Sequence, residues 1–187
     1  MLYQIDYSDL KNTLGFEGFY EDVFSEQGFD TEENFNSYCK MILAVWNKNF
    51  AEGIGRIEKF NEILGKIDYE HDKSIKTNWG GVYIVNHEHP VVEKYLAIKK
   101  GGYLAFEKHE LKEEELNVVE GAGFLLYRNS ENPKLIAKVL LPGTQVKFSP
   151  GQEHCIIGTE NLLIYEKSKD FKGMDKDLIF IYEPILN

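Results

Sequence analysis

The sequence predicts a mainly β domain, a sandwich or barrel of short antiparallel strands, preceded by an α-helical segment. After Thr77, apolar and polar residues alternate in short pieces. Turn signals such as Gly101-Gly102 and Pro142-Gly143 separate these pieces. Before residue 75 the apolar residues instead recur at steps of three and four. Many short strands with regular turns are typical of a sandwich or a barrel.

Each alternating piece is a candidate strand of this domain. The candidates are Val82–Asn86, Val91–Lys99, Tyr103–His109, Leu116–Tyr127, Lys134–Leu141, Thr144–Phe148, His154–Gly158, Leu162–Glu166 and Leu178–Tyr182.

The helical pattern runs from Asn34 to about Lys66, and Thr31 followed by two acids is a plausible helix start. Gly53 and Gly55 weaken its middle, so one helix and two helices both fit. Its aromatic stripe favours core packing or a dimer contact over a ligand groove. The polar run Asp68–Lys76 is interpreted as a connector. We therefore expect an N-terminal helical extension over residues 1–76 and a β-barrel domain over residues 77–187.

Composition restricts the class of protein. Of 187 residues, 43% are hydrophobic and 13% aromatic, enough for a packed core. The net charge of −10 disfavours both nucleic acid and an anionic membrane surface as partners. The two cysteines, Cys39 and Cys155, lack metal-type or redox-type spacing, which suggests reduced thiols in a cytoplasmic protein. The sequence shows neither a signal peptide nor a stretch long enough to span a membrane.

Two spaced motifs carry the chemistry. The first reads Gly101, five residues, Glu107-x-His109, four residues, Glu114, six residues, Gly121. Strand alternation places Glu107 and His109 on one face. The second reads Gly143, five residues, Ser149-Pro150-Gly151, two residues, His154, three residues, Gly158.

These motifs resemble those of the cupin superfamily over a little more than half of the chain. Every spacing fits, although Glu107 replaces the first histidine, and Ser149 and Gly158 depart at positions that are not ligands. The resemblance implies a cupin double-stranded β-helix, or jelly-roll barrel, behind the helical extension. It implies much less about the reaction, because one fold hosts many functions.

A closer resemblance is to mannose-6-phosphate isomerase-type cupins and related small sugar-processing cupins. Trp79-Gly80 and Lys99-Lys100-Gly101 match their lead-in, and Glu107 stands where that group commonly has glutamine. The metal ligands implied by this resemblance are Glu107, His109, Glu114 and His154. Nitrogen and oxygen donors without thiolate suit one divalent ion of zinc, iron, manganese or nickel. Without a dication, two facing acids would repel each other.

Several alternatives stay open at this point. Glu107 could be a non-ligand in a metal-free cupin. A second match runs from Gly81 through His87-Glu88-His89 to Glu93, but Pro90 interrupts it and its closing glycine comes late. We favour the later motif and expect His87 and His89 in an exposed loop. Alternation points Cys155 away from the metal. Four lysines are candidates for binding an anionic substrate or are ordinary surface residues: Lys94, Lys99, Lys100 and Lys138.

Three functions fit this interpretation. The first is a sugar or sugar-phosphate isomerase or epimerase, in which the metal binds adjacent oxygens and an unidentified base moves the proton. The second is an Fe²⁺-dependent dioxygenase. The third is a non-catalytic small-molecule-binding or structural cupin. The expected partner is a small polar molecule, and a homodimer is expected by analogy with other cupins.

Overall fold

The computed structural model describes residues 29–50, 57–128 and 135–185. Over these ranges the chain has two helices and two antiparallel sheets. The helices are α3 (Glu32–Asn49) and α4 (Glu58–Tyr69). The strands are β1 (Ser74–Thr77), β2 (Gly80–Glu88), β3 (Val91–Ile98), β4 (Phe106–His109), β5 (Glu113–Glu120), β6 (Gly123–Arg128), β7 (Ile136–Leu140), β8 (Gln145–Phe148), β9 (Glu153–Gly158), β10 (Leu162–Lys169) and β11 (Leu178–Tyr182).

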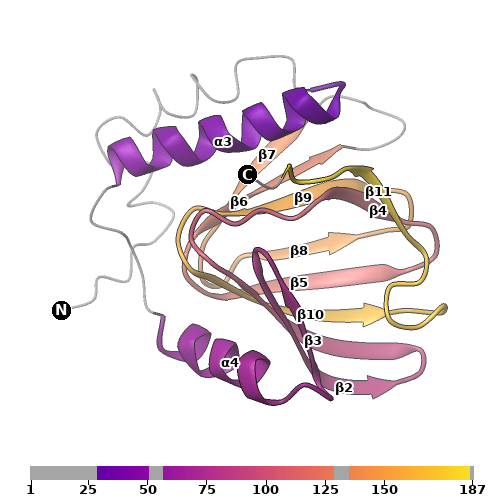
Figure 1. Ribbon diagram of the computed structural model, residues 1–187. Coiled ribbons are helices and arrows are strands. Elements are labelled where there is room, and N and C mark those ends of the chain that lie inside the picture. The colour runs from indigo at the N-terminus through magenta and orange to yellow at the C-terminus, as the bar shows by residue number, and fades with distance from the viewer. Residues whose placement is uncertain (1–28, 51–56, 129–134, 186–187) are drawn as a thin grey trace.

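The two sheets face each other and form a barrel (Figure 1). One has six strands in the order β1-β2-β3-β10-β5-β8, and the other has five in the order β11-β4-β9-β6-β7. Neighbours such as β3 and β10 are far apart in sequence, as in a jelly roll. Apolar side chains from both sheets fill part of the interior, including Leu116, Leu125, Ile156 and Ile164. This arrangement confirms the predicted mainly β jelly-roll barrel.

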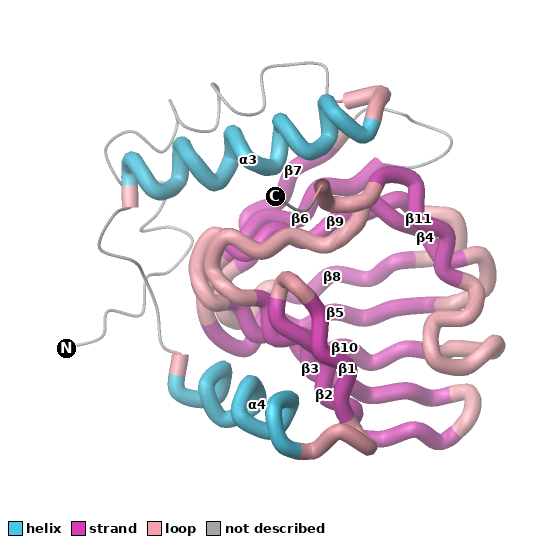
Figure 2. Tube along the Cα trace, in the orientation of Figure 1, coloured by secondary structure: helices cyan, strands magenta, loops and turns pink. Residues whose placement is uncertain are grey.

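Helix α3 covers the outer face of the five-stranded sheet (Figure 2). The Thr31 side chain accepts a hydrogen bond from the backbone of Asn34 and caps the helix start, as the sequence predicted. Phe35, Ile42 and Trp46 are fully buried against this sheet. The apolar stripe of α3 is therefore core packing.

Helix α4 packs against the outer face of the six-stranded sheet, where Phe60, Ile63 and Ile67 meet Ala97 and Leu163. Two helices account for the predicted helical pattern; Gly53, Ile54 and Gly55 lie outside the described residues.

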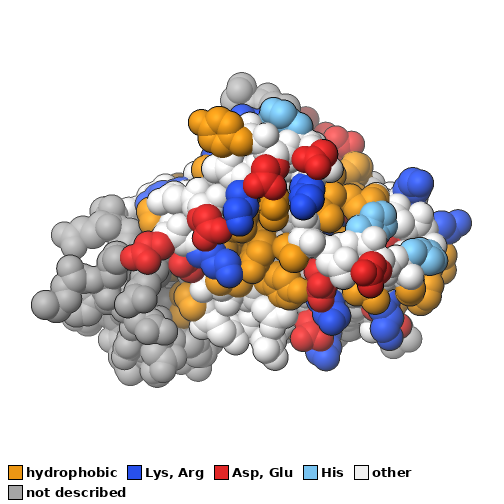
Figure 3. Space-filling model, turned by 90° about the horizontal axis from the view of Figure 1, so that it is seen from below, with side chains coloured by type: hydrophobic (Ala, Val, Ile, Leu, Met, Phe, Trp, Pro, Cys, Tyr) orange, Lys and Arg blue, Asp and Glu red, His pale blue; other side chains and the backbone are white. Residues whose placement is uncertain are grey.

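No helix in the described ranges is long and apolar enough to cross a bilayer. On the surface seen from below, Lys, Arg, Asp and Glu side chains are interspersed around hydrophobic ones (Figure 3).

The boundaries around residues 68–77 differ from the sequence prediction. The run Asp68–Lys76 is not simply a connector, because α4 continues to Tyr69 and β1 begins at Ser74 and pairs with β2. β1 is an edge strand with little burial, so its sequence is polar and does not show the alternation that predicts a strand. The division at residue 77 into an extension and a barrel domain stays a prediction.

The predicted strand Leu116–Tyr127 is two strands, β5 in one sheet and β6 in the other, with Gly121 between them. Gly121 has a φ of +85°, which L-residues rarely adopt. A Cβ at this position would lie 1.8 Å from the backbone oxygen of Asn161. The chain thus changes sheets at a residue that must be glycine.

Replacing Gly121 by alanine is therefore expected to destabilise the fold by at least about 2 kcal/mol, measured by urea denaturation. Gly65→Ala is the matched control, because a Cβ there meets nothing within 4 Å inside α4. That control should stabilise the protein by roughly 0.5–1 kcal/mol. Equal effects of the two substitutions would contradict the role assigned to Gly121.

Candidate metal and ligand site

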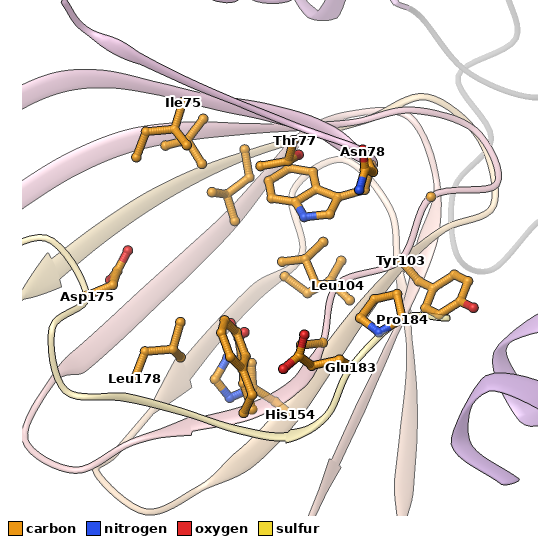
Figure 4. A pocket seen from close by; sticks show the side chains of 18 of the residues that line it. Ile75, Thr77, Asn78, Tyr103, Leu104, His154, Asp175, Leu178, Glu183 and Pro184 are labelled. Carbon is orange, nitrogen blue, oxygen red and sulfur yellow. The ribbon is translucent and has the colours of Figure 1, made fainter. Parts of the chain in front are cut away.

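A cavity of about 1020 Å³ lies between the two sheets. Its wall also includes Lys40 and Leu43 of α3 and the segment Glu183–Ile185 after β11. Figure 4 shows Ile75, Thr77 and Asn78 on the opposite side of the cavity from His154 and Leu178, with Leu104 between them. The volume is ample for a small-molecule ligand.

All four predicted ligand residues line this cavity. Glu107 and His109 lie on β4, Glu114 on β5 and His154 on β9, so both sheets contribute. Glu107 is directly opposite His154 in the antiparallel register. The side chains of His109, Glu114 and His154 are buried. The barrel thus brings together residues that are up to 47 positions apart in sequence.

Hydrogen bonds at Nδ1 orient both imidazole rings. His109 Nδ1 donates to Asp177 Oδ1 over 2.9 Å, and His154 Nδ1 lies 3.2 Å from the backbone oxygen of Gln152. A carboxylate and a carbonyl can only accept, so the hydrogen of each neutral ring is assigned to Nδ1. Burial lowers the pKa of His154, which keeps its ring neutral. Phe148 stacks on His154, with ring centroids 4.1 Å apart.

When both rings are in the neutral form that binds a metal, each Nε2 atom directs a lone pair toward Glu114. His109 Nε2 lies 3.6 Å from Glu114 Oε1, and His154 Nε2 lies 3.4 Å from Glu114 Oε2. Lone pairs that face a carboxylate repel it unless a cation lies between them. The three side chains therefore form a set of acceptors that lacks a positive partner on the imidazole side.

The two carboxyl groups of the predicted set have opposite proton affinities. Burial alone would raise the pKa of Glu114, but the positive charge of Lys112 outweighs burial, and the pKa falls to about 2. Burial, followed by the charge of Glu114, raises the pKa of Glu107 to about 8. A buried carboxyl with a raised pKa is one that lacks a nearby compensating cation.

A buried ion network adjoins these residues. Lys112 Nζ lies 2.7 Å from Glu114 Oε1, 2.8 Å from Glu166 Oε1 and 2.6 Å from Asp175 Oδ1. Lys94 Nζ lies 2.6 Å from Asp175 Oδ2 and 3.4 Å from Glu166. Burial by itself lowers the pKa of Lys112, but its three carboxylate neighbours raise it above the ordinary value. Both lysines are thus charged inside the barrel.

The loop between β10 and β11 supplies two acids of this region, Asp175 and Asp177. Asp177 Oδ2 accepts hydrogen bonds from the backbone amides of Leu111 and Lys112, at 2.8 and 2.9 Å, while its Oδ1 holds His109. Such a carboxylate–histidine pair is the usual support of a metal-bound imidazole, since it fixes the tautomer and the ring orientation.

A divalent ion requires donors of suitable chemistry and spacing. Within the described ranges, no group of three or more His, Cys, Asp or Glu side chains is arranged so that it could hold a metal ion without rearrangement. The chemistry of the donors nevertheless fits. Ligand atoms of a tetrahedral zinc site lie roughly 3.4 Å apart, given bonds of about 2.1 Å. The separations of 3.4 and 3.6 Å between Glu114 and the two imidazoles agree with that spacing.

The alternative motif forms no comparable cluster. His87 and His89 are exposed, as expected, but only His89 lies in the β2–β3 turn, because His87 lies within β2 and pairs with Val92. Glu93 pairs instead with Lys167. Cys155 is buried, and its thiol belongs to the cluster between α3 and the five-stranded sheet rather than to the cavity wall, as alternation predicted.

Of the four candidate lysines, only Lys94 lines the cavity; Lys99, Lys100 and Lys138 are exposed. Sequence reasoning did not identify four further residues of this region: Lys112, Glu166, Asp175 and Asp177. Glu166 shares the inward parity of Leu162 and Ile164 on β10, so alternation could have found it. No periodicity marks the two loop aspartates.

Comparisons with solved structures identify the fold. CapF, a capsular polysaccharide assembling protein from Staphylococcus aureus, matches with a TM-score of 0.52 and 16% identity over 58% of this chain and 32% of that chain. Oxalate decarboxylase from Lactobacillus farciminis, solved with formate, matches with a TM-score of 0.51 and 21% identity over 60% of this chain and 34% of that chain. This chain has the cupin fold.

At these identities the cupin match establishes the fold and nothing finer. The matched region spans about a third of the length of those two proteins. Oxalate decarboxylase from Bacillus subtilis also matches, with a TM-score of 0.51 and 15% identity over 60% of this chain and 30% of that chain, and that enzyme has Mn(II) centres. No protein-family model matches the sequence, and a search of curated proteins finds no significant relative. The resemblance to mannose-6-phosphate isomerase-type cupins stays a prediction.

Proposed function

We propose that this cupin holds one divalent metal ion among Glu107, His109, Glu114 and His154, and binds a small polar molecule beside it. The observation that carries the proposal is the pair of imidazole Nε2 atoms directed at the Glu114 carboxylate. A cation placed between them would turn this repulsion into coordination. The Mn(II) centres of the structurally similar Bacillus subtilis enzyme give independent support for a metal in a barrel of this kind.

The charge balance of the cavity supports the same proposal. Around the two imidazoles the wall carries the carboxyl groups of Glu107, Glu114, Glu166 and Asp175, and Glu183 adds another from the segment after β11. Lys94 and Lys112 supply the ammonium groups that pair with the first four acids, while Lys40 and Lys76 also belong to the wall. A dication would balance the remaining two negative charges when all four acids are ionised. Buried charges are tolerated when they are paired in this way.

The neighbouring residues would each have a definite task. Lys112 holds one oxygen of Glu114, and Asp177 holds His109 by its Nδ1. A bound divalent ion would polarise a carbonyl or hydroxyl oxygen of the ligand. Apolar side chains of the barrel, including Leu116 and Ile156, line the cavity beside these residues.

Elemental mass spectrometry on protein purified without chelators or an affinity metal tests the proposal. We expect about one equivalent of zinc, iron, manganese or nickel per chain. Failure to bind any of these ions, even after they are added, would overturn the metal site and leave a non-catalytic binding cupin.

The identity of the metal also bears on the reaction. Isomerisation or epimerisation of a molecule with adjacent oxygens is the reaction that the sequence resemblance favours. Iron together with oxygen consumption would favour the dioxygenase instead.

A further inference from the structure

Three strands line the cavity with one charged or polar residue and, two positions further along, one apolar residue. The pairs are Lys94 and Leu96 on β3, Glu114 and Leu116 on β5, and His154 and Ile156 on β9. Residues two apart on a strand face the same side and lie about 6.6 Å apart. The cavity therefore has a charged end and, directly beside it, an apolar stretch contributed by both sheets.

Large apolar side chains also remain exposed around this cavity. Ile75 is 47% exposed, Phe180 is 53% exposed and Ile185 is 43% exposed, and all three belong to its wall. Single exposed apolar residues are normal, but several that converge on one cavity mark a binding surface. Ile75 comes from β1, whereas Phe180 and Ile185 come from β11 and the segment that follows it, far from β1 in sequence.

An unmodified sugar fits the apolar stretch of this wall poorly. It carries hydroxyl groups along its whole length, and a buried hydroxyl without a hydrogen-bond partner opposes binding. Leu96, Leu116 and Ile156 offer no such partners. A molecule with a polar head and an apolar body would instead match both parts of the cavity.

We propose that the ligand of this cavity is amphipathic, with two adjacent oxygen atoms at the charged end and an aliphatic or aromatic body along the apolar stretch. The inference rests on the proposed metal site for the position of the head. It narrows the ligand class, and it departs from the sugar that the sequence resemblance implies.

A series of straight-chain hydroxamates tests the proposal, because the two hydroxamate oxygens chelate a metal while the chain length varies. Binding of acetohydroxamate through octanohydroxamate to the Zn²⁺-loaded full chain would be measured by isothermal titration calorimetry. Each added methylene is expected to raise affinity about two- to fourfold until the apolar stretch is filled. Gluconohydroxamate has the same number of carbons as hexanohydroxamate. We expect gluconohydroxamate to bind more weakly than hexanohydroxamate.

Substitutions at the exposed rim test the position of the body without disturbing the core. Phe180→Ser should weaken octanohydroxamate binding by at least about threefold and leave acetohydroxamate binding unchanged. Phe171→Ser is the matched control, because Phe171 is 52% exposed and lies outside the cavity wall. Ile75→Ser and Val85→Ser form a second such pair, with Val85 48% exposed and likewise outside the wall.

Two results would overturn the inference: affinity that does not depend on chain length, or gluconohydroxamate binding more tightly than hexanohydroxamate. Failure of the metal site would appear differently. Hexanamide and hexanohydroxamate would then bind equally well, because the head would gain nothing from the metal. The dependence of affinity on chain length would still show whether the apolar stretch binds the body of the ligand.

Discussion

Replacing His154 by alanine is expected to abolish stoichiometric metal binding, with the metal dissociation constant raised at least about 100-fold. His154 supplies one of the two Nε2 atoms that face Glu114, and its ring is held by Gln152 and by stacking on Phe148. Without it, only one imidazole remains in the donor set. Glu114→Ala should give the same result. Metal content and a competition titration with a chromogenic chelator measure the effect.

His87→Ala and His89→Ala are the matched controls for this prediction. Both residues belong to the alternative motif and both are exposed. Their variants should keep the full metal content. Loss of metal in the His87 variant, together with its retention in the His154 variant, would transfer the site to the alternative motif.

Replacing Lys112 by methionine is expected to destabilise the metal-free protein by about 3–5 kcal/mol. The ammonium group contacts Glu114, Glu166 and Asp175, all within 2.8 Å. Methionine matches the length of the side chain but leaves these carboxylates with only Lys94 nearby. Urea denaturation of chelator-treated protein, with the slope compared between variants, measures the change in the free energy of unfolding.

Lys147→Met is the control, since Lys147 pairs with Glu115 over 3.0 Å at the exposed surface of β8 and β5. That substitution should change the free energy of unfolding by no more than about 1 kcal/mol. If Lys112→Met cost no more than this control, the buried carboxylates would not depend on Lys112 for their compensation.

Local pattern predicted most of the barrel. Period-two alternation identified the strands around Val91–Ile98 and Leu162–Lys169 because one face of each is buried. It failed at β1, an edge strand with little burial, and at Gly121, where one apolar run continues across two sheets. An alternating pattern appears only where one face of a strand is buried, and β1 has little burial. At Gly121 the apolar residues continue through the turn, so the pattern does not show where one strand ends and the next begins.

The candidate site was partly predictable for a related reason. Motif spacing selected Glu107, His109, Glu114 and His154, and the fold places all four on one cavity. Their role as ligands stays a prediction, as do the homodimer and the cytoplasmic location. The supporting residues Lys112, Asp175 and Asp177 were not found, because their partners lie on other elements of the chain.

The sequence by itself predicted the cupin fold and selected the four candidate donor side chains, which the structure places on one cavity. These depend on periodicity and on fixed spacing along one or two strands. The tertiary structure alone decided that Asp177 orients His109 and that two buried lysines compensate three carboxylates. It also placed the charged end of the cavity beside an apolar stretch. Hydrogen bonds and ion pairs depend on distances in space, and the barrel closes those distances between strands and a loop that no local pattern connects.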